Sequence, residues 1–155
     1  MDLPDGPVAD LACGTSGSAL LAAARGRAVT AVDISELALG MLGDEARRRG
    51  LDHLITLVHA DLAAWPASPR SHALVLCTGW WARAVFVAAA DAVAPGGLLG
   101  WEAFTAEARQ ARPDLPSDWC LAPGEPASLL STEFTVLDEH DLPERGRRQL
   151  LARRQ

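Results

Sequence analysis

The sequence predicts an α/β protein with a doubly wound, Rossmann-like sheet of seven strands and helices on both faces. Short apolar segments alternate with helical segments from Val8 to Ala103, as expected for parallel strands covered on both faces. Several of these strands end in an acidic or glycine-bearing turn. Two later segments, Glu133–Glu139 and Arg147–Arg153, predict an antiparallel hairpin. We expect the strand order 3-2-1-4-5-7-6, with the last strand antiparallel.

The first half of the chain predicts two strand–helix units. Val8–Leu11 is apolar and predicts the first strand, and Ser18–Ala24 predicts a helix. Ala28–Val32 is a strand with β-branched residues. Ser35 is placed to cap a second helix that ends near Gly50.

Further elements follow in the same rhythm. The second helix is expected to turn Leu37, Met41 and Leu42 inward. The strands expected next are Leu54–Val58, Ala73–Cys77 and Leu98–Ala103, with a helix over Trp81–Ala94 and a turn at Pro95-Gly96-Gly97 before the last of them.

We expect residues 1–155 to form a single domain, with residues 104–130 as a substrate-side insert or lid. That segment is rich in proline and charge, and a helix at Thr105–Arg112 would be stopped by Pro113. Trp119 and Cys120 are candidate lid residues.

Composition and charge exclude several classes of protein. The net charge of −6 argues against a nucleic-acid-binding surface, and we interpret the arginines after Glu144 as a solvated strand edge. No apolar run is long enough to span a membrane, and no signal peptide is evident, so a cytoplasmic location is expected. The chain has no lysine and no tyrosine, which excludes a Walker-type phosphate loop, a pyridoxal Schiff base and a Tyr/Lys dehydrogenase. The three cysteines suggest neither a disulfide framework nor a metal site.

Residues at the expected carboxyl ends of the strands predict a nucleotide site. Asp10–Gly17 is an acid followed by a glycine-bearing turn at a helix start, and Asp33 ends the second strand, where it could hold a ribose diol. Asp61 and Cys77–Trp80 follow two other strands. Ligands of doubly wound sheets bind at this edge.

With these motifs, the chain resembles the class I S-adenosylmethionine-dependent methyltransferases, and within them the small bacterial group of tellurite- and thiopurine-type enzymes. Asp10-Leu11-Ala12-Cys13-Gly14-Thr15 is similar to the family's first motif, and Asp33 to its ribose-binding acid. Asp61-Leu62 is similar to the pair that holds adenine, and Leu74–Thr78 to the motif near the methionine part of the cofactor. Pro95-Gly96-Gly97 is a further family marker.

The resemblance implies S-adenosylmethionine as cofactor and a small-molecule acceptor. The implied cofactor-binding residues are Asp10, Ala12, Cys13, Gly14, Thr15, Asp33, Ile34, Asp61, Leu62, Cys77 and Thr78. Ala12 and Ser16 stand where the family often has glycine, and we expect Gly17 to take the positive φ that Ser16 would resist. Seven residues precede Val8, where relatives carry a helical segment, so we expect an open cleft or a homodimer that covers it.

The catalytic residue is not identified by the sequence. Glu102, Trp80 and His59 are the candidates: Glu102 as a base, a substrate anchor or a structural hydrogen-bond partner, and His59 as a base or a simple strand-end residue. Trp80 or Trp81 could wall a substrate pocket or pack the next helix. Two other functions stay open: a non-catalytic protein that binds the same cofactor, and a nicotinamide-dependent dehydrogenase.

Overall fold

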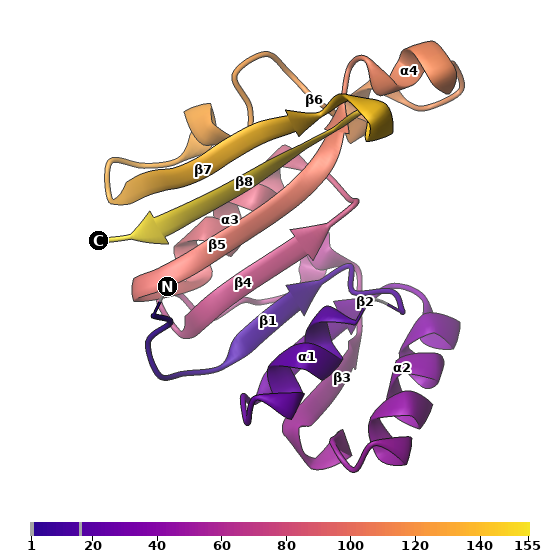
Figure 1. The fold of residues 1–155 in the computed structure, drawn as a ribbon, viewed down its shortest axis with the longest axis vertical. Helices are drawn as coiled ribbons and strands as arrows, with labels where there is room; N and C mark the ends of the chain where they lie inside the picture. Colours follow the sequence, from indigo (N-terminus) through magenta and orange to yellow (C-terminus); the bar gives the residue numbers. More distant parts are fainter. Residues whose placement is uncertain (1, 16) are drawn as a thin grey trace.

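A computed structural model describes residues 2–15 and 17–155, and its central sheet has the strand order β3-β2-β1-β4-β5-β8-β7 (Figure 1). The strands are β1 (Val8–Leu11), β2 (Val29–Asp33), β3 (Ile55–His59), β4 (His72–Thr78), β5 (Val93–Thr105), β6 (Cys120–Leu121), β7 (Phe134–Leu142) and β8 (Arg147–Arg154). The predicted order and the antiparallel final strand are confirmed. The difference is β6, a short strand that pairs with the end of β5 outside this path.

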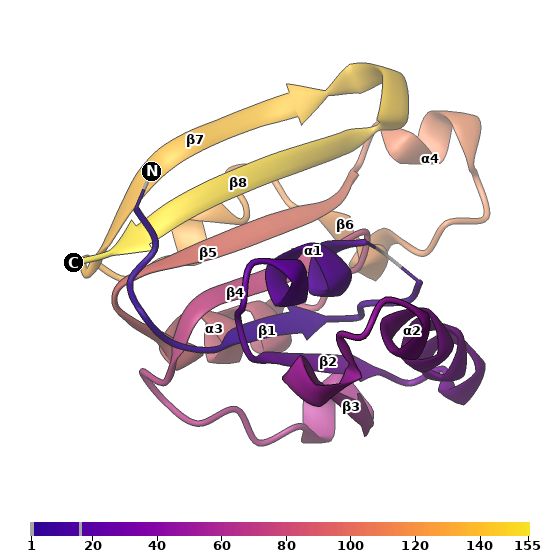
Figure 2. The ribbon, with the colours of Figure 1, turned by 60° about the horizontal axis from the view of Figure 1, so that its bottom comes forward.

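Helices cover both faces of the sheet, as the doubly wound prediction requires. They are α1 (Ser18–Ala24), α2 (Glu36–Arg48), α3 (Arg83–Ala92) and the short α4 (Ala108–Ala111). Figure 2 shows α1 and α2 on one side of the sheet and α3 on the other. Alternating residues of each central strand therefore enter different cores: Val8 packs beneath α1 and α2, whereas Ala9 faces α3.

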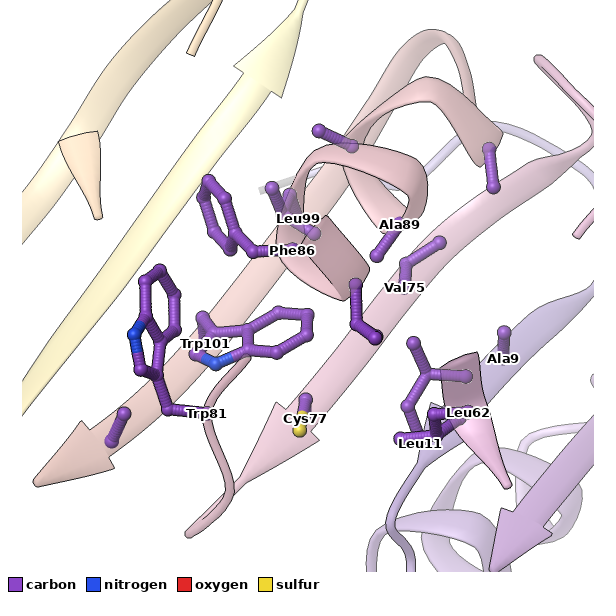
Figure 3. Close-up of a cluster of buried hydrophobic side chains, with 14 of the residues drawn as sticks. Ala9, Leu11, Leu62, Val75, Cys77, Trp81, Phe86, Ala89, Leu99 and Trp101 are labelled. Carbon is purple, nitrogen blue, oxygen red and sulfur yellow. The ribbon is translucent and has the colours of Figure 1, made fainter. Parts of the chain in front are cut away.

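The larger core lies between α3 and the central strands. Phe86 and Trp101 are 5.2 Å apart between ring centroids, and Trp81 lies 5.4 Å from Phe86 (Figure 3). Leu99 and Cys77 are fully buried against the same cluster. Trp81 is thus a core residue that fixes the start of α3.

The predicted inward stripe of α2 is wrong at two of its three positions. Leu37 is 77% exposed and Met41 55% exposed, whereas Leu42 is buried together with Leu39 and Ala46. Ser35 caps the helix as predicted, accepting a hydrogen bond from the Ala38 amide at 3.1 Å. With the helix start fixed there, positions 39, 42 and 46 face the sheet at helical spacing.

The expected turn at Pro95-Gly96-Gly97 lies within β5, which begins at Val93. The pairing with β4 shifts register between His72 and Leu74, and Gly96 has φ +77°. A side chain at Gly97 would meet the Ala73 carbonyl oxygen at 2.9 Å. This bulge carries the chain from α3 into β5 without a separate loop.

The C-terminal arginines do not form a solvated strand edge, so that interpretation is wrong. β8 lies between β5 and β7, and β7 occupies the edge. Arg154 is only 3% exposed, while Arg148 pairs with Asp141 at 2.6 Å. Most of the arginines in this segment are therefore paired with carboxylates of the same domain.

The segment 104–130 leaves the carboxyl end of β5 and makes a small core of its own. β5 extends to Thr105, so the expected helix is reduced to α4. Cys120 packs with Ala108 and Leu115, and Trp119 is 56% exposed. Within residues 2–15 and 17–155, no helix is long and apolar enough to cross a membrane.

Candidate functional site

A cavity of about 310 Å³ opens at the carboxyl ends of β1, β2, β3 and β4. This is the edge at which doubly wound sheets bind ligands, beside the first strand, where the order of connections reverses. The lining residues are Ala12, Asp33, Ile34, Ala60, Asp61, Leu62, Thr78, Gly79 and Trp80. Six of them were predicted as cofactor-binding residues, and Trp80 was predicted as a pocket or catalytic candidate.

Asp33 fastens the loop after β1 to the start of α2. One carboxylate oxygen accepts a hydrogen bond from the Gly14 amide at 2.7 Å, and the other accepts one from the Ser35 amide at 2.8 Å. Each oxygen retains a lone pair for a further donor. Since Asp33 is half-buried at the cavity wall, its carboxylate can shape the loop and accept hydrogen bonds from a diol.

Asp61, Ile34 and Leu62 make a second part of the wall. One oxygen of Asp61 caps the 3₁₀ turn Leu62–Ala64 by accepting from the Ala63 amide at 3.0 Å, and its side chain remains exposed. Ile34 is 68% exposed and Leu62 is 9% exposed. A planar aromatic ligand could lie between these two apolar side chains with an acceptor at its edge.

Five predicted cofactor residues do not line the cavity: Asp10, Cys13, Gly14, Thr15 and Cys77. Asp10 and both cysteines are buried. Burial, reinforced by the charge of Asp10, raises the pKa of Cys13 to about 12, and burial likewise raises the pKa of Cys77. Cys13 and Cys77 also belong to cores on opposite faces of the sheet, so neither thiol is a nucleophile at this site.

The turn after β1 takes positive φ angles at Ala12 (+50°) and Gly14 (+51°). Gly17 has φ −75°, so it does not take over a positive φ from its neighbour as expected. Ser16 itself lies outside the described residues. Ala12 therefore holds a left-handed conformation that a glycine would adopt without steric cost.

We expect Ala12→Gly to stabilise the protein by about 0.5–1 kcal/mol, because relief of the left-handed strain exceeds the extra entropy of the unfolded chain. Thermal unfolding should show a midpoint raised by roughly 1–4 °C. The matched control is Ala22→Gly within α1, which has ordinary helical geometry and should lower stability by about 1 kcal/mol. A lower midpoint for Ala12→Gly would contradict the assignment of strain.

The three catalytic candidates separate clearly in the structure. Trp80 lines the cavity, and its carbonyl oxygen accepts a hydrogen bond from Trp101 Nε1 at 3.0 Å. His59 lies outside the cavity, with Nε2 at 2.9 Å from the Ile34 carbonyl oxygen, so it acts as a strand-end contact. Glu102 also lies outside it, on a groove that the cavity adjoins at Thr78.

Glu102 is poorly suited to accept a proton. Burial alone would raise the pKa of its carboxyl, but hydrogen bonds from Gln149 and Arg147 and the charges of Arg147 and Arg145 outweigh burial and lower the pKa. A base with a lowered pKa gains little by taking a proton at neutral pH. Its structural role is therefore favoured over general-base catalysis.

Two lining residues, Ala60 and Gly79, were not predicted as cofactor-binding residues. Each directly follows a strand, and Gly79 has φ +88°, which a glycine adopts readily. The sequence feature that could have identified both residues is their position directly after a predicted strand. Among the described residues, no group of three or more His, Cys, Asp or Glu side chains is placed to hold a metal ion.

Residues 8–97 match the model of a known family whose description is a methyltransferase domain. The match covers more than half of the chain and includes every residue that lines the cavity. This protein belongs to that methyltransferase family. The expected family is thus confirmed at this level.

Solved methyltransferases share the fold over nearly the whole chain. An S-adenosylmethionine-dependent methyltransferase from Mesorhizobium loti is 17% identical with a TM-score of 0.77, covering 99% of this chain and 94% of its own. Geranyl diphosphate C-methyltransferase from Streptomyces coelicolor, solved with S-adenosyl-L-homocysteine, is 13% identical with a TM-score of 0.76, covering 97% of this chain and 71% of its own. A glycopeptide N-methyltransferase solved with S-adenosyl-L-methionine is 18% identical with a TM-score of 0.66, covering 96% and 87%. Among curated proteins, none matches the sequence.

Proposed function

We propose that this methyltransferase moves a methyl group from S-adenosylmethionine to a small-molecule acceptor. The observation that supports it is the convergence of Asp33, Asp61 and the apolar pair Ile34 and Leu62 on one cavity at the carboxyl edge of the sheet. These groups suit the parts of an adenosine: a carboxylate for the ribose diol, a second for the adenine amine, and two apolar faces for the ring. A cavity of about 310 Å³ is of the size that holds small ligands.

S-adenosylmethionine, when bound, supplies a methyl group on a positively charged sulfonium. The chain's own contribution is to bind, align and exclude water. Asp33 and Asp61 would hold the adenosine, and Thr78, Gly79 and Trp80 form the wall nearest to β5, where an acceptor can approach. Because Asp33 and Asp61 are assigned to the adenosine, neither is placed to take a proton from an acceptor.

Among the described residues that line the cavity, Asp33 and Asp61 are the only titratable side chains, which favours acceptors that react without a general base. Thiolates and soft oxyanions are nucleophilic without proton transfer to the protein in the transition state. We therefore propose acceptors of this kind, which suits the tellurite- and thiopurine-type group that the sequence resembles.

A cytoplasmic location and a homodimer stay predictions. Light scattering at the protein concentrations used for the titrations tests whether the protein is a dimer.

The donor site is tested by calorimetric titration with S-adenosylhomocysteine, with NAD titrated in parallel. We expect micromolar binding of the first and none of the second. Ile34→Asn should weaken binding about tenfold, by loss of an apolar face for the ring. Leu37→Asn is the matched control: Leu37 is even more exposed, lies outside the cavity, and should bind as the wild type does.

The outcomes separate the three functions. Tight binding with no methyl transfer to any thiol, phenol, amine or chalcogen oxyanion would favour a non-catalytic binding protein. Preferential binding of NAD would favour a dehydrogenase. A folded wild-type protein that binds neither ligand overturns the proposed function.

A further inference from the structure

We infer that Arg147 is an acceptor-binding residue and that the acceptor carries a carboxylate. This inference rests on the proposed methyl-transfer function and names the class of substrate for the same site. Its basis is the placement of one arginine side chain beside the cofactor cavity, with part of its guanidinium committed to the fold and part of it free.

Arg147 lies at the start of β8, against Gly79 of the cavity wall. A Cβ atom at Gly79 would lie 3.4 Å from its Nη1 atom and 3.6 Å from Nη2, so the guanidinium lies directly against a residue of the cavity wall. The guanidinium carbon also lies 4.7 Å from the ring centroid of Phe104, the residue opposite it in the β5–β8 pairing. The guanidinium is thus placed over an aromatic ring beside the cavity wall.

Glu102 positions this arginine. Its Oε1 accepts a hydrogen bond from Arg147 Nη1 at 2.5 Å, and its Oε2 accepts one from Gln149 Nε2 at 2.6 Å. Glu102 is only 8% exposed, so both carboxylate oxygens are used within the fold. The amide of Gly79 donates to the Glu102 carbonyl at 2.8 Å, which fixes the end of β4 to the same residue.

The free donors of Arg147 have the geometry of a carboxylate site. Within residues 2–15 and 17–155, its Nε and Nη2 atoms make no hydrogen bond, and the side chain is 30% exposed. These two atoms form one side of the guanidinium fork, which binds both oxygens of a carboxylate at once. The chain shows this pairing one residue later: Arg148 binds Asp141 through Nε at 2.6 Å and Nη2 at 3.2 Å.

The surrounding charge favours an anion although the whole chain is acidic. Arg112 lies 5.1 Å from the Phe104 ring centroid, and Arg145 is close enough to lower the pKa of Glu102. Asp138 also lines the adjoining groove, with its Oδ2 at 3.0 Å from His140 Nδ1. Near the free fork, the three arginines Arg112, Arg145 and Arg147 therefore outnumber the two carboxylates of Glu102 and Asp138.

A groove of about 260 Å³ leaves room for the body of such an acceptor, and Glu102, the partner of Arg147, is part of its lining. It adjoins the cofactor cavity at Thr78, which lines both, and its floor includes Leu76, Gly100 and Leu151. A Cβ at Gly100 would lie 2.7 Å from the Leu76 side chain, so only a glycine at this position leaves that part of the groove open. The occupant expected is a small, partly apolar acid that presents its nucleophile at the Thr78 end.

The test uses thiol acceptors in pairs that differ in charge: mercaptoacetate and mercaptoacetamide, 3-mercaptopropanoate and 3-mercaptopropanamide, 2-mercaptobenzoate and 2-mercaptobenzamide. Methyl transfer from S-adenosylmethionine is measured for each with the full chain. We expect at least one acid to be preferred over its amide by about tenfold or more in kcat/KM, mainly through a lower KM. Arg147→Gln should remove this preference, and Arg147→Lys should restore only part of it, because lysine lacks the fork.

Two controls separate binding from folding. Arg153→Gln changes the same kind of residue at the far end of β8, where it binds the Gly96 carbonyl, and should keep the acid preference. Glu102→Gln/Arg147→Gln leaves no unmatched carboxylate in the fold and should behave as Arg147→Gln does. Unchanged binding of S-adenosylhomocysteine in the variants shows that the donor site is intact.

Failure of this inference is distinguishable from failure of the proposed function. If the wild type binds S-adenosylhomocysteine but prefers no acid, or if the preference survives Arg147→Gln, Arg147 is not the acceptor anchor. If the folded wild type does not bind S-adenosylhomocysteine, the proposed function itself is rejected, and this inference with it.

Discussion

Asp33→Asn is expected to weaken the binding of S-adenosylhomocysteine by about 100-fold, equivalent to about 2.7 kcal/mol. The carboxylate accepts hydrogen bonds from the amides of Gly14 and Ser35, so two donors converge on its two oxygens. An asparagine offers one oxygen and one NH₂ group, and the NH₂ must face one of these donors. The substitution therefore removes an acceptor for the ribose and releases the loop that shapes the cavity.

The same change should lower stability, since a hydrogen bond to a charged group contributes about 1.5–3 kcal/mol. Calorimetry gives the affinity, and thermal unfolding gives the stability of each variant in parallel. Asp61→Asn is the comparison: its exposed carboxylate accepts one backbone hydrogen bond, so binding should weaken with little loss of stability. A folded Asp33→Asn protein that binds within about threefold of the wild type would contradict the role assigned to Asp33.

The sequence predicts those site residues whose location follows from their position directly after a strand. A residue at the carboxyl end of a parallel strand lies at the ligand-binding edge whatever the details of packing. This is why Asp33, Asp61 and Thr78 are brought together as expected. The same local logic places the helix start at Ser35, where a side chain caps a backbone amide.

The parts that the sequence misses depend on register between distant segments. Arg147 meets Glu102 across 45 positions, and a shift of one residue in β8 would turn it to the opposite face of the sheet. Its sequence context, a short run of arginines after a turn, favours a solvated edge over a binding site. The exposure of Leu37 has a similar cause, because the inward face of α2 depends on how the helix is rotated against the sheet.

Arg154, in the same C-terminal segment, has a structural role that the sequence does not reveal. The side chain is 3% exposed, and its Nη1 atom lies 3.2 Å from each of the carbonyl oxygens of Ala90, Asp91 and Val93, at the end of α3. Its Nη2 atom binds Glu133. A cation that caps the last carbonyls of a helix also interacts favourably with the helix dipole. Arg154 therefore joins the last strand to α3, whose buried face forms much of the larger core.

Arg154→Met is expected to lower the free energy of unfolding by about 2–3 kcal/mol. Methionine retains the apolar stem but removes the guanidinium from all three carbonyls; those of Ala90 and Asp91 keep the backbone amides of Val93 and Arg70 as donors. Glu133 keeps its ion pair with Arg70 at 2.7 Å, so the loss of stability comes mainly from the end of α3 and not from an unpaired carboxylate. Urea unfolding should show the lower stability, and the thermal midpoint should fall by roughly 4–12 °C.

Two further variants decide whether this cost belongs to the helix end. Arg153→Met removes hydrogen bonds to the carbonyls of Gly96 and Asp2 and should cost no more than about 1–2 kcal/mol. Glu133→Gln removes the charge partner and leaves the carbonyl contacts of Arg154, so it should cost less than Arg154→Met. Equal losses for Glu133→Gln and Arg154→Met would instead assign the stabilisation to the ion pair. A loss below about 1 kcal/mol for Arg154→Met would show that packing and backbone hydrogen bonds hold the end of α3 without Arg154.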